Sequence, residues 1–391
     1  MKIHTVKKEE TIYDIAREYC TASTKILENN GLFDGYATRQ DSLPIGDELL
    51  ILSPTRSYTV RSGDTLFDIA KRFGTRVNDL LKYNPALMGN DIIYPEEILS
   101  IKYAPKTNAI CLVNGYLYNG WKEENLRAVL PHLSYVTVSA HKLKSGRLQS
   151  LFDAERAAKI ARDSGKCVLL RLYIPKEEKL EFKGGPLLEF EREAVRLGCH
   201  GITLAAESRL NDRGILNGIF DLKKQLISDE LSLFLETTSD LEPIYADIAD
   251  GIVINSDPVA MTAESARAEE KKLRSIAEKC DFARIFTDIS PFGYRYSAAG
   301  KTPLEINEAR KIAKNRRAKI DYDSDTMLNS FSESEGGERI VFPSLKKIKA
   351  MLDLTCELGF LGVSIDIMRC ATAHLMMIST EYISGCDYFP M

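Results

Sequence analysis

Five acidic side chains follow short apolar runs in the C-terminal part of the chain, where strands are expected to end. These are Glu207, Glu236, Asp257, Asp288 and Asp366, with Tyr116, Arg171, Tyr173 and Arg369 at comparable positions. Two carboxylates about 5 to 9 Å apart are enough to act as acid and as base or nucleophile at a glycosidic bond. Each residue taken singly is more typical of a solvated loop carboxylate. A two-carboxylate glycosidase is therefore one hypothesis that the sequence leaves open.

Cysteine and histidine residues offer little further chemistry. Cys199 and His200 are adjacent like a nucleophile and its base, but neighbouring residues of a strand point to opposite faces. His141 and His200 are more typical of structural histidines than of ligands. The eight cysteines are dispersed and form no Cys-x-x-Cys pair, which disfavours disulfide-stapled domains and zinc ribbons. We expect neither a cofactor nor a metal site.

Eight short apolar runs alternate with amphipathic helical stretches beyond residue 108, and such an alternation would bring the acidic side chains together. Continuous apolar strands covered by helices indicate a parallel sheet. Eight of them over roughly 250 residues fit a (β/α)8 barrel, an α/β fold whose functional residues lie at the carboxyl ends of the strands. Residues of about 292–343, before the last run, are predicted to form a small inserted α+β unit. The eight runs cover 110–113, 135–138, 168–172, 201–204, 231–235, 251–254, 283–286 and 362–365.

A repeat occupies the first hundred residues or so. HTVKKEETIYDIAREYCTASTKILENN, from His4, aligns without a gap with YTVRSGDTLFDIAKRFGTRVNDLLKYN, from Tyr58. Each copy predicts a strand, two short helices and a returning strand. Thr65 or Asp64 is suited to begin a helix, because its side-chain oxygen accepts a hydrogen bond from a free amide of the first turn. We therefore expect two βααβ modules at 1–53 and 57–103, followed by the barrel at 108–391.

The composition argues against several classes of partner. Lys and Arg total 52 against 56 for Asp and Glu, which gives a net charge of −4. Binding to nucleic acid without sequence preference needs clustered positive charge, so nucleic acid is not an expected partner. No apolar run approaches the length of a membrane span, and MKIHTVKKEE lacks the apolar core of a secretory signal. We expect a soluble protein that is made in the cytoplasm and has no membrane partner.

The repeat resembles the LysM module, which binds glycans that contain N-acetylglucosamine, such as peptidoglycan and chitin. The second copy matches in YTVRSGDTLFDIAKRFG and in the late Tyr94-Pro95, whereas the first has Glu9-Glu10 in place of Gly-Asp and Cys20 in place of the helix-ending Gly. The resemblance implies that the sugar lies between the loop after the first strand and the loop before the second. Those loops carry Ser62, Gly63, Asp64, Thr65, Asn84, Ile93 and Tyr94.

The remaining chain resembles the spore-cortex-lytic N-acetylglucosaminidases of glycoside hydrolase family 18, and with the repeat the resemblance covers nearly the whole sequence. It rests on VNGYLY from Val113, ISPFGYRY from Ile289, KTPLEINEARKIAK from Lys301, and LKKIKAMLDLTCELGFLGVSI ending at Ile365. The family carries Asp-x-x-Asp-x-Asp-x-Glu on its fourth strand. The attacking nucleophile is the N-acetyl carbonyl of the substrate itself.

That acidic motif is altered in this chain. HGITLAAE, from His200 to Glu207, aligns with it, so the resemblance places the general acid at Glu207. Ala205 stands where the Asp that orients the substrate acetamide would be, and Thr203 and His200 replace the two earlier Asp residues. Loss of one preorganised group that stabilises transition-state charge costs about 10² to 10³ in rate.

The resemblance thus implies a peptidoglycan-binding protein with weakened or absent glycosidase activity. An active N-acetylglucosaminidase with Glu207 as general acid is the alternative. Relatives without a signal peptide are held on bacterial spores, so the expected location is the spore cortex, the spore coat or the cell wall.

Overall fold

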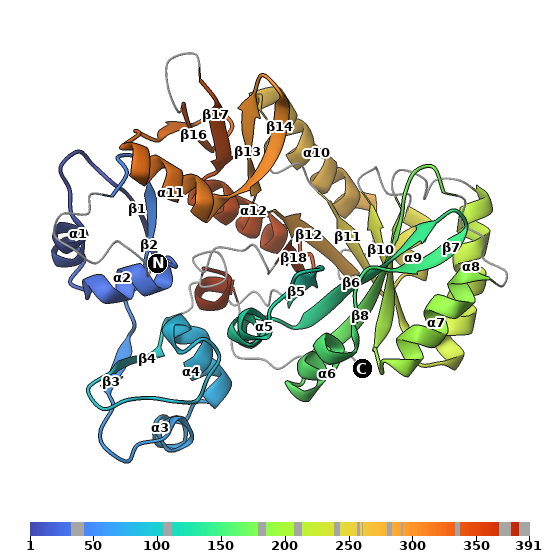
Figure 1. Ribbon diagram of the computed structural model, residues 1–391, viewed down its shortest axis with the longest axis horizontal. Coiled ribbons are helices and arrows are strands. Elements are labelled where there is room, and N and C mark those ends of the chain that lie inside the picture. The colour runs from blue at the N-terminus through green and yellow to red at the C-terminus, as the bar shows by residue number, and fades with distance from the viewer. Residues whose placement is uncertain are drawn as a thin grey trace.

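The structure is a computed structural model, which describes residues 1–32, 43–104, 112–178, 185–206, 213–237, 243–255, 259, 261–279, 284–290, 292–332, 337–366 and 377–382. Two small N-terminal units, a barrel and an antiparallel sheet unit lie together in one body (Figure 1). No helix in these ranges has both the length and the apolar character needed to cross a membrane.

The first repeat folds as two antiparallel strands with two helices between them. Its elements are β1 (Lys2–Thr5), α1 (Ile12–Glu18), α2 (Ser23–Asn29) and β2 (Glu48–Ile51). Thr11 begins α1, because its hydroxyl accepts from the amide of Asp14 while the Asp14 carboxylate accepts from the amide of Thr11. This reciprocal cap satisfies two amides that a helix start otherwise leaves unpaired.

The second repeat has the same architecture. Its elements are β3 (Arg56–Thr59), α3 (Leu66–Phe73), α4 (Val77–Tyr83), a 3-10 turn (Pro85–Leu87) and β4 (Ile98–Lys102). Thr65, rather than Asp64, caps α3 by accepting from the amide of Asp68 at 3.1 Å. The βααβ arrangement predicted for both repeats is confirmed.

The two repeats keep the same backbone where their residue types differ. Gly74 ends α3 with φ of +62°, and Cys20, its counterpart after α1, has φ of +50°. Gly63 and its counterpart Glu9 have φ of +86° and +63°. A side chain in the left-handed region meets its own backbone, which glycine avoids. The first repeat therefore holds two strained positions that the second repeat fills with glycine.

We expect Cys20→Gly to raise the free energy of unfolding by a few tenths to about 1 kcal/mol, because relief of strain outweighs the added freedom of the unfolded chain. The matched change Gly74→Ala should lower it by about 1 kcal/mol. Urea denaturation followed by circular dichroism measures both. A loss of stability in Cys20→Gly would mean that the cysteine side chain contributes more than its backbone strain costs.

The described residues include eight parallel strands that close into a barrel. Each strand pairs with the next along the chain, and the first pairs with both the second and the last. A further strand, β7 (Arg147–Ser150), folds back on the second in an antiparallel hairpin. Every predicted apolar run overlaps one of the barrel strands, so the predicted (β/α)8 barrel is confirmed. The strands are β5 (Leu112–Leu117), β6 (Tyr135–Lys144), β8 (Cys167–Ile174), β9 (Gly201–Ala206), β10 (Ser232–Thr237), β11 (Gly251–Ile254), β12 (Ile285–Ile289) and β18 (Gly362–Asp366).

Helices between successive strands cover the outside of the barrel (Figure 1). Ala157, Ala158 and Ala161 form part of a buried stripe on the second of them, and Gly165 follows it with φ of +69°, as a helix-ending glycine should. The helices are α5 (Glu123–Val129) with a 3-10 turn (Leu130–His132), α6 (Glu155–Asp163), α7 (Pro186–Arg196), α8 (Arg213–Ser228), α9 (Pro243–Ile248), α10 (Ala263–Lys279) and α12 (Leu345–Glu357), with a π-helical turn (Ile378–Tyr382) near the C-terminus.

The barrel interior is filled in layers. An apolar plug closes its amino end, where the ring centroid of Tyr135 lies 5.5 Å from that of Phe234 and 5.7 Å from that of Phe286. Above the plug, the Asn114 amide accepts a hydrogen bond from Thr137 at 2.7 Å and donates one to Ser364 at 3.0 Å. Residues two apart on a strand share a face, so the next inward residues line the carboxyl end of the barrel.

An antiparallel sheet unit lies between the seventh and eighth barrel strands, as predicted for the α+β insertion. Its strands pair in the order β14-β13-β17-β16-β15, with one helix packed on them. The elements are β13 (Phe292–Ser297), β14 (Gly300–Glu305), α11 (Ile306–Arg316), β15 (Asp321–Asp323), β16 (Leu328–Ser332) and β17 (Arg339–Pro343).

The first repeat docks on this insertion through a buried ion pair. Arg310 of α11 donates to both carboxylate oxygens of Asp47 at 2.9 to 3.0 Å, and the two side chains are only 5% and 2% exposed. The neighbouring Glu48 accepts from the amide of Leu345, in the first turn of α12, at 2.6 Å. A Cβ at Gly46 would lie 1.9 Å from the carbonyl oxygen of Ile320, so the two backbones touch. The first repeat is thereby fixed against α11 and α12 (Figure 1).

Candidate functional site

The carboxyl end of the barrel is crossed by a buried ion pair between strands that are not neighbours. Arg171 of β8 donates through Nε and Nη2 to the two carboxylate oxygens of Glu236 of β10, both at 2.7 Å. The residues are 8% and 7% exposed. Such parallel, charge-assisted bonds are among the strongest and most directional that side chains form.

Ala205 lies on the strand between these two side chains. Strand β9 lies between β8 and β10, with Arg171 in register with Thr203 and Glu236 in register with Ala205. Ile202 and Leu204 pack into the core between barrel and helices, so Thr203 and Ala205 face the interior. A methyl group at position 205 leaves room for Arg171 and Glu236 to pair across β9. A carboxylate there would compete for that space and for the guanidinium.

Surrounding side chains complete the hydrogen bonds of the pair. Glu236 also accepts from the Tyr116 hydroxyl at 3.1 Å and from the Asn255 amide at 3.0 Å. Arg171 donates through Nη1 to the Ser139 hydroxyl at 3.0 Å. Its guanidinium carbon lies 5.6 Å from the ring centroid of Tyr116 and 5.7 Å from that of Tyr173, within cation–π range.

The charges of the pair hold both groups ionised. Burial alone would raise the pKa of Glu236, but the positive charge of Arg171 and the hydrogen bonds from Arg171, Asn255 and Tyr116 bring it below its usual value. Burial opposes the charge of Arg171, yet attraction to Glu236 raises the Arg171 pKa above its usual value. An ionised carboxylate accepts hydrogen bonds and has no proton to donate. Glu236 is therefore unsuited to act as a general acid in a two-carboxylate mechanism.

Two other predicted carboxylates lie at the same barrel end. Asp288 and Asp366 are half-buried at the ends of β12 and β18. The pKa of Tyr118 is raised mainly by burial, and the charges of Glu236, Asp366 and Asp288 add to that effect. The carboxyl end of the barrel, called the mouth below, thus holds six of the predicted residues: Tyr116, Arg171, Tyr173, Glu236, Asp288 and Asp366. Glu207, Asp257 and Arg369 lie outside the described residues.

Three members of the mouth were missed in the sequence. Tyr118 stacks on Tyr116 with ring centroids 6.1 Å apart, while Ser139 and Asn255 hold the ion pair. The two-residue alternation from Tyr116 to Tyr118 and from Thr137 to Ser139 was the available signal. Asn255 directly follows β11 and has no comparable pattern around it.

The histidines near the barrel strands have structural surroundings. Nδ1 of His200 accepts from the amide of Val168 at 3.0 Å, at the amino end of the barrel and away from the mouth. Burial raises the pKa of the adjacent Cys199 thiol to about 12, which leaves it a poor nucleophile. The ring of His141 is buried against Phe190, and burial lowers its pKa.

The predicted glycan-binding loops of the second repeat are largely on the surface. Ser62, Gly63 and Thr65 are exposed after β3, and a Cβ at Gly63 would meet nothing within 4 Å. Tyr94, shortly before β4, is 63% exposed, whereas its neighbour Ile93 packs partly into the core of the repeat. Asp64 is half-buried and accepts from the Tyr58 hydroxyl at 2.7 Å and the Arg61 amide at 2.8 Å.

Asn84 was expected among the glycan contacts, and the structure corrects this. The residue is 1% exposed. Its amide nitrogen donates to the carbonyls of Leu80 and Ser100, and its oxygen accepts from the Ser100 amide. Asn30 makes the equivalent bonds to Ile26 and Leu50 in the first repeat. This asparagine therefore ties the second helix to the last strand in each repeat and is not available to a sugar.

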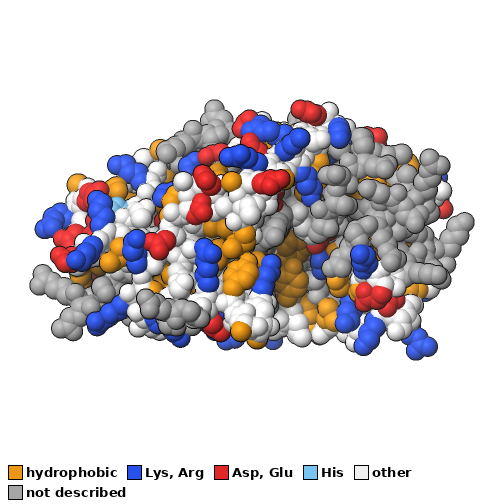
Figure 2. Space-filling model, turned by 90° about the horizontal axis from the view of Figure 1, so that it is seen from above, with side chains coloured by type: hydrophobic (Ala, Val, Ile, Leu, Met, Phe, Trp, Pro, Cys, Tyr) orange, Lys and Arg blue, Asp and Glu red, His pale blue; other side chains and the backbone are white. Residues whose placement is uncertain are grey.

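Charges of both signs are interspersed over the described atoms of the face in Figure 2. The figure shows no extended area of Lys and Arg alone on these atoms. A nucleic-acid backbone is held by clustered cations, so this face offers no such surface among the described atoms.

Comparison with known proteins identifies the repeats. The model of the LysM domain matches residues 4–51 and 58–102, so the chain carries two LysM domains. The probable peptidoglycan endopeptidase LytE of Bacillus subtilis is 31% identical over 109 residues, which are 25% of this chain and 30% of that protein. The matches span about a third of the length of the curated relatives.

Comparison with solved structures identifies the fold of the whole chain. The spore cortex-lytic enzyme SleL of Bacillus cereus aligns over 98% of this chain and 99% of its own, with a TM-score of 0.72 and 18% identity. A chitinase from Chromobacterium violaceum aligns over 69% of this chain and 98% of its own, with a TM-score of 0.60 and 15% identity. The barrel therefore has the fold of these glycoside hydrolases.

Proposed function

For a chain with two LysM domains on a barrel of the SleL fold, we propose binding of peptidoglycan or a related glycan that contains N-acetylglucosamine. The exposed loop with Ser62, Gly63 and Thr65, together with Tyr94, is the surface that we assign to the sugar in the second repeat. An exposed tyrosine beside polar backbone suits a sugar ring, which presents an apolar face and a rim of hydroxyls. Asp64 shapes the loop through its bonds to Tyr58 and Arg61.

We further propose that the barrel has lost most of the family-18 catalytic apparatus. The observation that carries this proposal is the Arg171–Glu236 pair, which spans β9 beside Ala205, the position where the resemblance to family 18 expects the acetamide-orienting carboxylate. An acetamide nucleophile needs a negative partner to orient it and to stabilise the positive intermediate. Glu236, which is in register with Ala205, is fully engaged by four donor groups.

The glycan-binding assignment places the protein at the cell wall, with the spore cortex or coat as the specific proposal. The LysM domains supply attachment to the glycan there, and neither nucleic acid nor a membrane is a proposed partner.

We expect the full-length chain to sediment with insoluble peptidoglycan, and Tyr94→Ala to reduce the bound fraction severalfold because it removes an exposed aromatic contact. Phe220→Ala is the matched control, since Phe220 is an exposed aromatic side chain on barrel helix α8 and should leave binding unchanged. The full chain is the proper reagent because the first repeat is docked on α11. If the wild-type chain stayed in the supernatant at every glycan concentration, the binding proposal would be wrong.

Hydrolysis is tested by incubating the chain with spore-cortex and vegetative peptidoglycan and analysing reducing ends and muropeptides. The degenerate barrel predicts no release above a blank without protein. Fragments that end in N-acetylglucosamine and disappear in Glu207→Gln would instead establish the alternative, an active N-acetylglucosaminidase with Glu207 as general acid. Activity that survived Glu207→Gln but vanished in Asp366→Asn would point to a rebuilt two-carboxylate site.

A further inference from the structure

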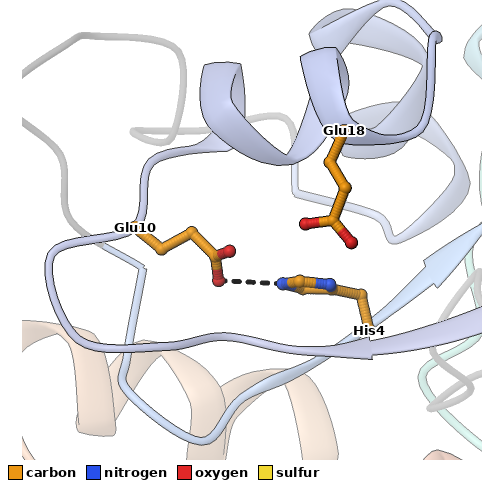
Figure 3. A group of neighbouring side chains, drawn as sticks. All are labelled: His4, Glu10 and Glu18. Atoms are coloured by element: carbon orange, nitrogen blue, oxygen red, sulfur yellow. Dashed lines mark hydrogen bonds and ion pairs between the residues drawn. The ribbon is translucent and has the colours of Figure 1, made fainter.

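A histidine and two glutamates converge on one face of the first repeat (Figure 3). His4 lies on β1, Glu10 in the loop that follows, and Glu18 at the end of α1. One ligand atom from each lies within 4.8 Å of the others. His4 is 4% exposed, Glu10 half-buried and Glu18 exposed, so the cluster opens to solvent on one side.

The ring of His4 is held from both sides. Its Nε2 lies 2.8 Å from the Glu10 carboxylate and its Nδ1 lies 3.1 Å from the Tyr19 hydroxyl. Glu10 is itself fixed, because the same oxygen accepts from the amide of Lys7 at 2.8 Å. A histidine whose second nitrogen is hydrogen-bonded to a neighbouring group is oriented as metal-bound histidines usually are.

The second repeat carries a different trio at the same three positions, where the gapless alignment pairs residues 54 apart. Tyr58, Asp64 and Arg72 stand for His4, Glu10 and Glu18. The Tyr58 hydroxyl donates to Asp64 at 2.7 Å, and Arg72 donates to the Tyr58 oxygen at 2.6 Å. The Arg61 amide donates to Asp64 just as the Lys7 amide donates to Glu10. Both repeats thus use one backbone frame.

The charges at these positions differ between the repeats. In the second repeat, one carboxylate faces one guanidinium, with Arg72 Nη2 3.6 Å from Asp64 Oδ1, so the charges cancel. In the first repeat, the position of the guanidinium holds a second carboxylate, so two carboxylates surround the imidazole of His4. Imidazole with carboxylates is a ligand set suited to a divalent transition-metal ion, Zn²⁺ among them.

We propose that His4, Glu10 and Glu18 bind a divalent transition-metal ion, with Zn²⁺ as the probe ion. The ion takes the place that the Arg72 guanidinium holds in the second repeat. It links β1, the following loop and the end of α1. One ring nitrogen of His4 and one oxygen from each glutamate bind it, and water completes the coordination. The sequence alone does not indicate the site, because it shows no metal-binding cysteine spacing or histidine pair there. The repeat fold brings the three ligands together.

Isothermal titration calorimetry of the metal-free full-length chain with ZnCl₂ tests the proposal. Wild type should bind one Zn²⁺ at a site that Glu18→Arg weakens by roughly tenfold or more, because a ligand is lost and a cation is placed in the site. Glu18→Arg imports the residue of the second repeat at an exposed position, so the fold should be retained. His4→Tyr, which imports Tyr58 in the same way, is the second variant. Arg72→Glu in the second repeat is the matched control and should leave Zn²⁺ binding unchanged.

Thermal unfolding gives an independent readout. Zn²⁺ should raise the Tm of wild type and of Arg72→Glu but not that of Glu18→Arg or His4→Tyr, because an ion that binds only the folded state stabilises it. Equal Zn²⁺ affinity in wild type and both first-repeat variants would assign the ion to other side chains and overturn the proposal. Absence of binding by wild type at millimolar Zn²⁺ would overturn it as well.

Discussion

Replacing Arg171 with Met lowers the free energy of unfolding by about 3 to 5 kcal/mol, because it leaves the Glu236 carboxylate buried without a counter-charge. Tyr116 and Asn255 still donate to that carboxylate, but neutral donors do not compensate for the charge. Urea denaturation at neutral pH measures the loss. The paired change Arg171→Met with Glu236→Leu should recover much of it, because no uncompensated charge then remains.

The pH dependence of Arg171→Met distinguishes this cause from simple loss of packing. In the wild type the pKa of Glu236 lies below its usual 4.5, so the pair contributes stability above that pH and loses it as the pH falls through the lowered pKa. In the variant, burial without Arg171 raises the Glu236 pKa. The loss in free energy of unfolding relative to the wild type should therefore be largest at neutral pH. It should shrink toward pH 4, where the Glu236 carboxyl of the variant is mostly protonated in both the folded and the unfolded state. A deficit of the same size at both pH values would indicate a packing defect instead.

Asp47→Ala has the second large expected effect. It should lower the free energy of unfolding by about 3 to 5 kcal/mol, because it leaves the buried guanidinium of Arg310 without its counter-charge. Arg310→Met should cost a similar amount, and the double variant should cost clearly less than the sum of the two, as expected for residues that act as a pair. Lys346→Ala is the control. Lys346 pairs with Glu48 at 3.0 Å but is 38% exposed, so its loss should cost less than about 1 kcal/mol.

Hydrogen exchange locates the effect of Asp47→Ala. The amide of Leu345 is held by Glu48, next to Asp47, and it should exchange faster once the first repeat is loosened. Amides of barrel strand β10 should be unaffected, because that strand pairs with β9 and β11 rather than with an element of this interface. Uniform acceleration across both regions would mean that the variant unfolds globally rather than at the docking surface.

The sequence predicts the fold well because its strongest signals are local. The apolar runs of β9 and β10 and the gapless repeat from His4 and Tyr58 each depend on neighbouring residues, and the structure confirms the barrel and both βααβ units. Thr65 as a helix cap follows in the same way from the adjacent turn.

The composition of the site follows from the sequence less completely, because side chains distant in the chain decide it. Glu236 was predicted to lie at the mouth, but its partner Arg171 is 65 residues away, and their pairing depends on the register of both strands with β9. From the sequence alone, Asn84 resembles an exposed turn residue, but its side-chain amide is hydrogen-bonded to both α4 and β4.

The docking of the first repeat was likewise beyond prediction from sequence. Asp47 reads as a turn residue after Gly46, whereas its partner Arg310 lies 263 residues away on an unremarkable amphipathic helix. Nothing local to either residue indicates that it is buried. The two buried charges are explained only by the packing of the first repeat on the insertion, which brings them together.

The buried contact between Asp47 and Arg310 also determines how a mechanical load would travel through the protein. A tether of flexible residues would let the first repeat swing and would absorb a pull on it. Here a pull on the first repeat would pass instead through the Asp47–Arg310 pair and the Glu48–Leu345 hydrogen bond into α11 and α12. α12 leads directly into barrel strand β18. A force applied to the first repeat would thus reach the wall of the barrel through side-chain contacts rather than through the linking segment of the chain.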